Sequence, residues 1–186
     1  MGTIPKGSTY IKTVPFFLKI SAFIVLLVGI GTLGRFLDKV DKGNILESYG
    51  GKARLEFGMS ALVVSWVAVI VMIVVFVSGL HEKITAINWP LTVLINMILW
   101  AAVLLVACGL LAYTVYKYET EKTLFLFTFC DTLKRAKNFD ANCSHLYVAT
   151  ACCFIAAKIF AIDAKFNYKL YKDNASPAPA PSTQGK

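Results

Sequence analysis

The sequence FGMSALVVSWVAVIVMIVVFVSGL, residues 57–80, contains no charged residue. An α-helix needs about 20 such residues to cross the roughly 30 Å hydrocarbon core of a membrane. Its many valines and isoleucines would favour a strand in water, but a strand crosses a bilayer in about ten residues and needs barrel partners. The stretch therefore predicts a membrane-spanning helix.

Three further apolar stretches lie on either side of it, at residues 14–34, 87–116 and 145–163. The chain has 186 residues, of which 57% are hydrophobic, and its mean hydropathy is +0.64. Four spans leave too little chain for a soluble domain. We therefore predict an all-α membrane protein, a left-handed bundle of four transmembrane helices within residues 14–172.

An N-terminal tail, residues 1–13, and a C-terminal tail, residues 173–186, flank the spans. The second tail is rich in Pro, Ala and Ser and lacks large apolar residues, so we expect it to be disordered. An even number of spans places both tails on one side. The count of lysines and arginines does not decide whether this side is cytosolic. Taken literally, the count places the loops opposite the tails in the cytosol.

Two cysteines give a better indication of orientation. Cys130 and Cys143 lie in the same connecting segment, and they make a candidate disulfide if that segment faces an oxidising compartment. Both tails would then be cytosolic. The alternative is a pair of reduced thiols in a cytosolic loop.

Small residues recur on one face of three of the spans. Helix association in lipid depends on close van der Waals contact, which small side chains permit. The cysteines among them are interpreted as packing residues rather than metal ligands, because no histidine or carboxylate lies at a matching depth. The predicted packing seam consists of Gly58, Ala61, Ser65, Ala68, Ala101, Cys108, Ala112, Ala149, Cys152 and Ala156.

Polar residues within the spans are few, and each is a candidate for function. Lys19 and Lys158 lie near span ends, so their stems can reach the interface. Asp163 lies at the boundary and can pair with Lys158 or with a lysine of a neighbouring helix. Asn96 is a candidate for a hydrogen bond between helices. Together they form no polar pathway of the kind that a channel or transporter requires.

The sequence offers no catalytic or cofactor-binding motif. The two histidines, His81 and His145, lie at the ends of different spans, on opposite membrane faces in the predicted topology. We expect a protein that is not an enzyme and binds no metal or cofactor. The net charge of +8 comes from residues scattered around the membrane ends, which favours contact with anionic lipid headgroups over nucleic acid.

Three passages resemble the MARVEL-domain family of tetraspan membrane proteins, which includes plasmolipin, MAL and synaptophysin. They are PFFLKISAFIVLLVGIGTLG from Pro15, INMILWAAVLLVACGLLAYT from Ile95, and ATACCFIAAKIFAIDAKFNYKLYK from Ala149. In the last passage, Asp163 and the aromatic and basic run after it match the way the family's fourth helix commonly ends. The resemblance covers about residues 12–172.

The resemblance implies a nonenzymatic protein of the plasma membrane or of vesicles. Such a protein organises membrane domains, or assists vesicle trafficking or membrane apposition, and associates with cholesterol-rich lipid. Its partners would be membrane lipids and copies of itself, or a larger membrane complex. The alternative from a different class is a small auxiliary subunit of a channel, receptor or transporter, and a transporter in its own right is a weaker third interpretation.

Overall fold

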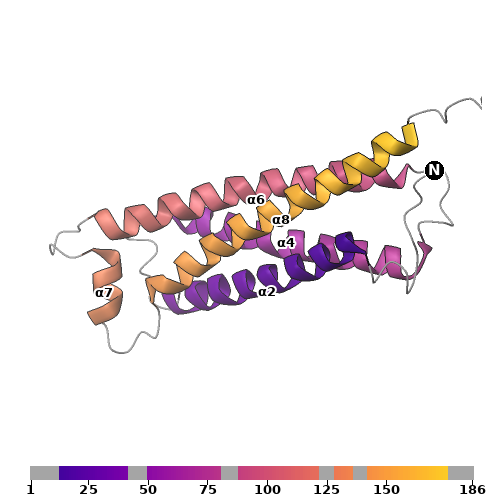
Figure 1. Ribbon diagram of the computed structural model, residues 1–186. Helices are drawn as coiled ribbons and strands as arrows, with labels where there is room; N and C mark the ends of the chain where they lie inside the picture. Colours follow the sequence, from indigo (N-terminus) through magenta and orange to yellow (C-terminus); the bar gives the residue numbers. More distant parts are fainter. Residues whose placement is uncertain (1–12, 42–49, 81–87, 122–127, 136–141, 176–186) are drawn as a thin grey trace, which may run out of the picture.

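The computed structural model describes residues 13–41, 50–80, 88–121, 128–135 and 142–175. Four long helices run side by side: α2 (Val14–Asp41), α4 (Lys52–Val77), α6 (Trp89–Thr120) and α8 (Cys143–Ala175). A short helix, α7 (Phe129–Arg135), lies across one end of the bundle (Figure 1). In this part of the chain, all four long helices have the length and composition to cross a membrane, as predicted.

The helices extend beyond the predicted apolar stretches at several ends. α2 continues to Asp41 rather than ending at residue 34, and α8 continues to Ala175 rather than ending at residue 163. The reason is that apolar composition reports the segment that fits hydrocarbon, whereas a helix also satisfies its backbone hydrogen bonds outside the membrane. The first residues of the expected C-terminal tail are therefore helical, and residues 176–186 lie outside the described residues, as do residues 1–12.

Local sequence features set where the helices begin and end. Pro90 occupies the first turn of α6, where its missing N–H would have had no partner within the helix. Gly79 follows the last turn of α4 with φ 70°, a left-handed conformation that glycine adopts without strain. α7 begins with a reciprocal cap, since Thr128 Oγ1 accepts from the Asp131 N–H at 3.2 Å and donates to its carboxylate at 2.9 Å.

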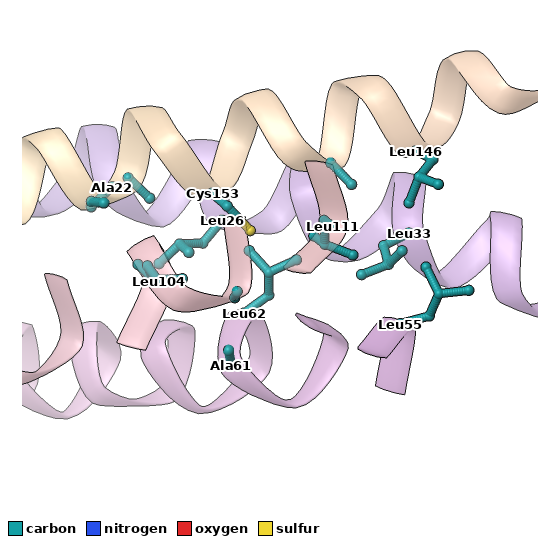
Figure 2. Close-up of a cluster of buried hydrophobic side chains, with 14 of the residues drawn as sticks. Ala22, Leu26, Leu33, Leu55, Ala61, Leu62, Leu104, Leu111, Leu146 and Cys153 are labelled. Carbon is teal, nitrogen blue, oxygen red and sulfur yellow. The ribbon is translucent and has the colours of Figure 1, made fainter. Parts of the chain in front are cut away.

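Each helix packs against two neighbours in the order α2, α4, α6, α8 and back to α2, with α8 making the most extensive contacts, to α6 and α2. The core runs along the middle of the bundle and is filled by apolar side chains from all four helices (Figure 2). Its fully buried members include Leu26, Leu62, Leu104 and Cys153. α2 begins and α8 ends at the same end of the bundle, and α7 lies at the other (Figure 1).

We call the end where α2 begins and α8 ends the terminal end, and the end where α7 lies the α7 end.

Candidate functional sites at the two ends of the bundle

An ion pair lies inside the bundle near the terminal end. Lys19 Nζ on α2 donates to Asp163 Oδ2 on α8 at 2.6 Å, and the side chains are only 2% and 1% exposed. Asn167 Nδ2 donates to Asp163 Oδ1 at 3.2 Å and to its backbone carbonyl at 2.8 Å. The ammonium lies 6.0 Å from the centroid of the Phe76 ring on α4. The pair thus connects the first long helix to the last, with α4 beside it.

Helical spacing explains why both charges face inward. Lys19 is followed by Ala22 and Leu26 on the buried face of α2, and Asp163 follows Phe160 on that of α8. A buried pair of opposite charges regains through mutual attraction part of what it loses in desolvation, but an apolar pair of similar volume is often at least as stable. We therefore interpret the pair as a device that fixes which faces of α2 and α8 meet.

The structure corrects one expectation about Lys19 and decides between the two partners left open for Asp163. Lys19 does not reach the interface, because its ammonium is held by Asp163 inside the bundle. Of the two pairings left open for Asp163, the lysine of a neighbouring helix is the one observed. Lys158 is exposed instead, with its ammonium 5.2 Å from the centroid of the Phe154 ring one turn away.

A disulfide stabilises the α7 end. Cys130 on α7 and Cys143 at the start of α8 are joined by an S–S bond of 2.02 Å, with their Cα atoms 5.9 Å apart. The candidate disulfide predicted from the sequence is therefore present. Phe129, next to Cys130, is fully buried and stacks on Tyr118 of α6 with a centroid distance of 4.2 Å. The disulfide and this ring contact together hold α7 against the bundle.

A second polar contact at the α7 end joins α4 to α6. Arg54 Nε donates to Thr114 Oγ1 at 3.1 Å, and the guanidinium lies 5.0 Å from the centroid of the Tyr113 ring. The Tyr118 hydroxyl donates to the carbonyl of Gly50 at 2.9 Å, just before α4 begins. Arg54 precedes the apolar stretch of residues 57–80, so the sequence places it in a loop and does not indicate this contact.

A hydrogen bond from the Tyr147 hydroxyl of α8 to the Glu119 carboxylate of α6 also lies at this end. Both residues are exposed. This bond links the two helices that make the most extensive contact in the bundle.

The predicted seam residues lie in different environments. Those that are buried are Gly58, Ala61, Ser65, Ala101, Ala149, Cys152 and Ala156. Ala68 and Cys108 are partly buried, and Ala112 is exposed. Contact is closest at Gly58, where an added Cβ atom would lie 2.9 Å from a methyl group of Leu111 on α6. The close approach that small residues allow is therefore clearest between α4 and α6.

One polar residue within the spans, Asn96, differs from the expectation. Asn96 Oδ1 accepts a bond from Trp100 Nε1 at 3.1 Å, so its observed partner lies in its own helix rather than in a neighbour. The hydroxyl of Ser65 and the indole N–H of Trp66 are buried and have no hydrogen-bond partner within the described residues.

Apolar grooves mark the outer surface of the bundle. One, with a volume of about 400 Å³, lies between α6 and α8 and is lined by small and aromatic side chains, among them Ala112, Ala151 and Phe154. Another, of about 190 Å³, lies between α2 and α4. Among the residues that the structure describes, no group of three or more His, Cys, Asp or Glu side chains could bind a metal ion. His81 lies outside those residues.

Comparison with known protein families identifies a match to this chain. The family model of the membrane-associating domain called MARVEL matches residues 10–166, which is most of the chain. No curated protein and no solved structure matches it significantly. The match covers α2, α4, α6, α7 and most of α8, including both Lys19 and Asp163. The chain belongs to the MARVEL family of membrane-associating domains, and it is an integral membrane protein with four candidate spans.

Proposed function

We propose that this protein organises membrane domains, or assists vesicle trafficking or membrane apposition, through lateral contacts with lipids and with copies of itself. In this proposal it catalyses no reaction. The membrane concerned is the plasma membrane or that of vesicles, and cholesterol-rich lipid is part of its surroundings, as the family resemblance implies.

The observation that carries the proposal is the contrast between the surface and the interior of the bundle. Large apolar side chains face outward from every long helix, including Phe17 on α2, Val74 on α4, Ile95 on α6 and Ile155 on α8. Such a surface matches lipid tails and the surfaces of other membrane helices.

The interior supports the same proposal. It is filled with leucine and other apolar side chains, and the buried charged side chains of the described residues, Lys19 and Asp163, bind each other. A transporter or channel uses intramembrane charges to bind or conduct its substrate. Here the charges serve to join α2 to α8, which favours a structural role for the bundle.

The proposed orientation places the terminal end in the cytosol and the α7 end in an oxidising compartment. The Cys130–Cys143 disulfide supports it, because such bonds persist in secretory and extracellular compartments and are rare in the cytosol.

The experiment that tests the function is extraction of the tagged full chain in a mild detergent, followed by native gel electrophoresis. Assemblies that contain only this chain and lipid are expected. Reconstituted into fluorescent giant vesicles, the same preparation should form clusters without added protein. A heteromeric complex of fixed stoichiometry would instead support the auxiliary-subunit alternative and contradict the proposal.

A second measurement addresses transport. Liposomes that contain the protein should show no solute flux above that of protein-free liposomes. Flux that disappears in a correctly folded Asp163→Asn variant would overturn the proposal in favour of a transporter.

A further inference from the structure

Four lysines form a stripe along the outer face of α8. Lys158, Lys165, Lys169 and Lys172 are separated by seven, four and three residues, and all four are exposed. At about 100° per residue, these spacings place them within about 60° of one another around the helix. We call these four residues the lysine stripe.

The stripe faces away from the bundle. The residues that α8 buries at this level, Phe160, Asp163 and Asn167, lie on the opposite side of the helix. Between Cys143 and Lys172 the helix has one acidic residue, Asp163, and that carboxylate is bound to Lys19. The positive charge of Lys165 and Lys169 is therefore not offset by a carboxylate in that part of their own helix.

The depth of the stripe changes along its length. Lys158 lies within the apolar span, five residues before Asp163, and its ammonium lies beside the Phe154 ring, one turn toward the α7 end. A rotation of its flexible stem would carry the ammonium toward the interface at the terminal end instead. Lys169 and Lys172 lie about 6 Å and about 10 Å farther along the helix axis than Lys165. The stripe thus offers cations at two levels, one at the edge of the hydrocarbon and one farther out.

The side chains beside the stripe fit a lipid rather than a soluble partner. Ile162 is exposed between Lys158 and Lys165, where acyl chains begin. Phe166 and Tyr168 are exposed on either side of the stripe, as aromatic residues at a membrane interface are.

We propose that the lysine stripe binds the headgroup of an inositol phospholipid that is phosphorylated on its ring, in the leaflet at the terminal end. The phosphodiester would contact Lys158 and Lys165, and the ring phosphates would contact Lys169 and Lys172. Phosphatidylserine carries its charge at a single level and matches the stripe less well. The proposal rests on the proposed function only in placing the terminal end in the cytosol, where such lipids are exposed.

Native mass spectrometry of the purified full-length chain tests the proposal. Phosphatidylinositol 4,5-bisphosphate, phosphatidylinositol and phosphatidylserine are titrated separately, and the bound fractions are compared. We expect the bisphosphate to bind at least tenfold more tightly than either of the others. Equal binding of the bisphosphate and phosphatidylserine, when compared at equal total charge, would overturn the proposal whatever the variants do.

The test variant is Lys165→Gln/Lys169→Gln. It should weaken binding of the bisphosphate about thirtyfold, because each lysine near an anionic headgroup contributes about 1 kcal/mol. The matched control removes two lysines near the α7 end, Lys39→Gln/Lys117→Gln, and should leave binding unchanged. Equal losses in both variants would show nonspecific charge attraction and contradict the proposal.

The clustering of this protein in giant vesicles is measured in membranes that contain no phosphoinositide. It can therefore succeed when the lipid proposal fails, and the two failures are distinguishable.

Discussion

The two ends of the bundle are held together by different kinds of interaction. At the terminal end, α2 and α8 are joined by a noncovalent ion pair that is almost completely buried. At the α7 end, α7 and α8 are joined by a covalent disulfide, supported by the stacking of Phe129 on Tyr118. A buried ion pair forms whatever the redox state of the compartment, whereas a disulfide needs an oxidising one. In the proposed orientation, the ion pair lies toward the cytosolic side and the disulfide lies on the oxidising side, so each interaction is compatible with its surroundings.

The comparison also shows that α8 is the element common to both ends. It is bound to α2 at one end and to α7 at the other, and it makes the most extensive contacts in the bundle. α4 depends instead on close approach at Gly58 and on the bond from Arg54 to Thr114.

Loss of one ionic partner should have the largest effect. Lys19→Met leaves the Asp163 carboxylate buried without its cation, which we expect to lower the free energy of unfolding by about 3–5 kcal/mol. Denaturation of the purified protein in detergent measures this. Lys158→Met is the matched control, since that lysine is exposed on α8, and it should cost far less.

The double variant Lys19→Met/Asp163→Leu sharpens this prediction. Removal of both charges should restore most of the stability lost in the single variant. If Lys19→Met were as stable as the wild type, the buried ion pair would contribute nothing to the free energy of unfolding.

Loss of the disulfide should have the next largest effect. We expect Cys130→Ser/Cys143→Ser to lower the free energy of unfolding by about 2–4 kcal/mol, because the unfolded chain regains the freedom of an open loop. Reductant should destabilise the wild type by a similar amount and leave the double variant unchanged. Reductant that destabilises both equally would argue against this role for the bond.

A smaller effect is expected where α4 meets α6. Gly58→Val places a side chain against Leu111, where even a Cβ atom would lie at 2.9 Å, and overpacking of this kind costs about 1–3 kcal/mol. Gly109→Ala is the control, because an added Cβ meets no atom within 4 Å there. Thermal unfolding in detergent compares the two, and equal midpoints would contradict the close contact.

The smallest effect should come from Arg54. Arg54→Met removes the bond to Thr114 and the contact with the Tyr113 ring, which together contribute about 1 kcal/mol. Arg54→Lys keeps the charge but not the Nε donor, so it should recover only part of the loss. Full recovery with lysine would mean that charge alone is responsible.

The four helices could be predicted from the sequence because each apolar stretch has the length that a membrane requires. The family resemblance and the pairing of Cys130 with Cys143 could also be predicted from the sequence. The partner of Asp163 could not be chosen between Lys158 and a neighbouring helix, because the choice depends on how α2 and α8 are rotated. That rotation is fixed by packing of the whole bundle, which one sequence does not show.

Other differences have local causes. Asn96 has a tryptophan four residues later, at the spacing that brings side chains together on a helix, and this sequence signal could have predicted its bond to Trp100. Ala112 shares a helix face with Cys108 by spacing, yet it is exposed beside a groove. Spacing identifies residues on one face but does not say how far the neighbouring helix covers that face.

In the proposed orientation, the two ends of the bundle lie on opposite sides of the membrane, with the disulfide on the oxidising side and the terminal end in the cytosol. The direct test is labelling of intact cells with a membrane-impermeant thiol reagent, combined with an antibody to a C-terminal tag. In intact cells, Cys130 and Cys143 should be labelled from outside only after reduction. The antibody should reach the tag only after the membrane is permeabilised. Labelling of both cysteines from the cytosolic side without reduction would contradict the proposed orientation.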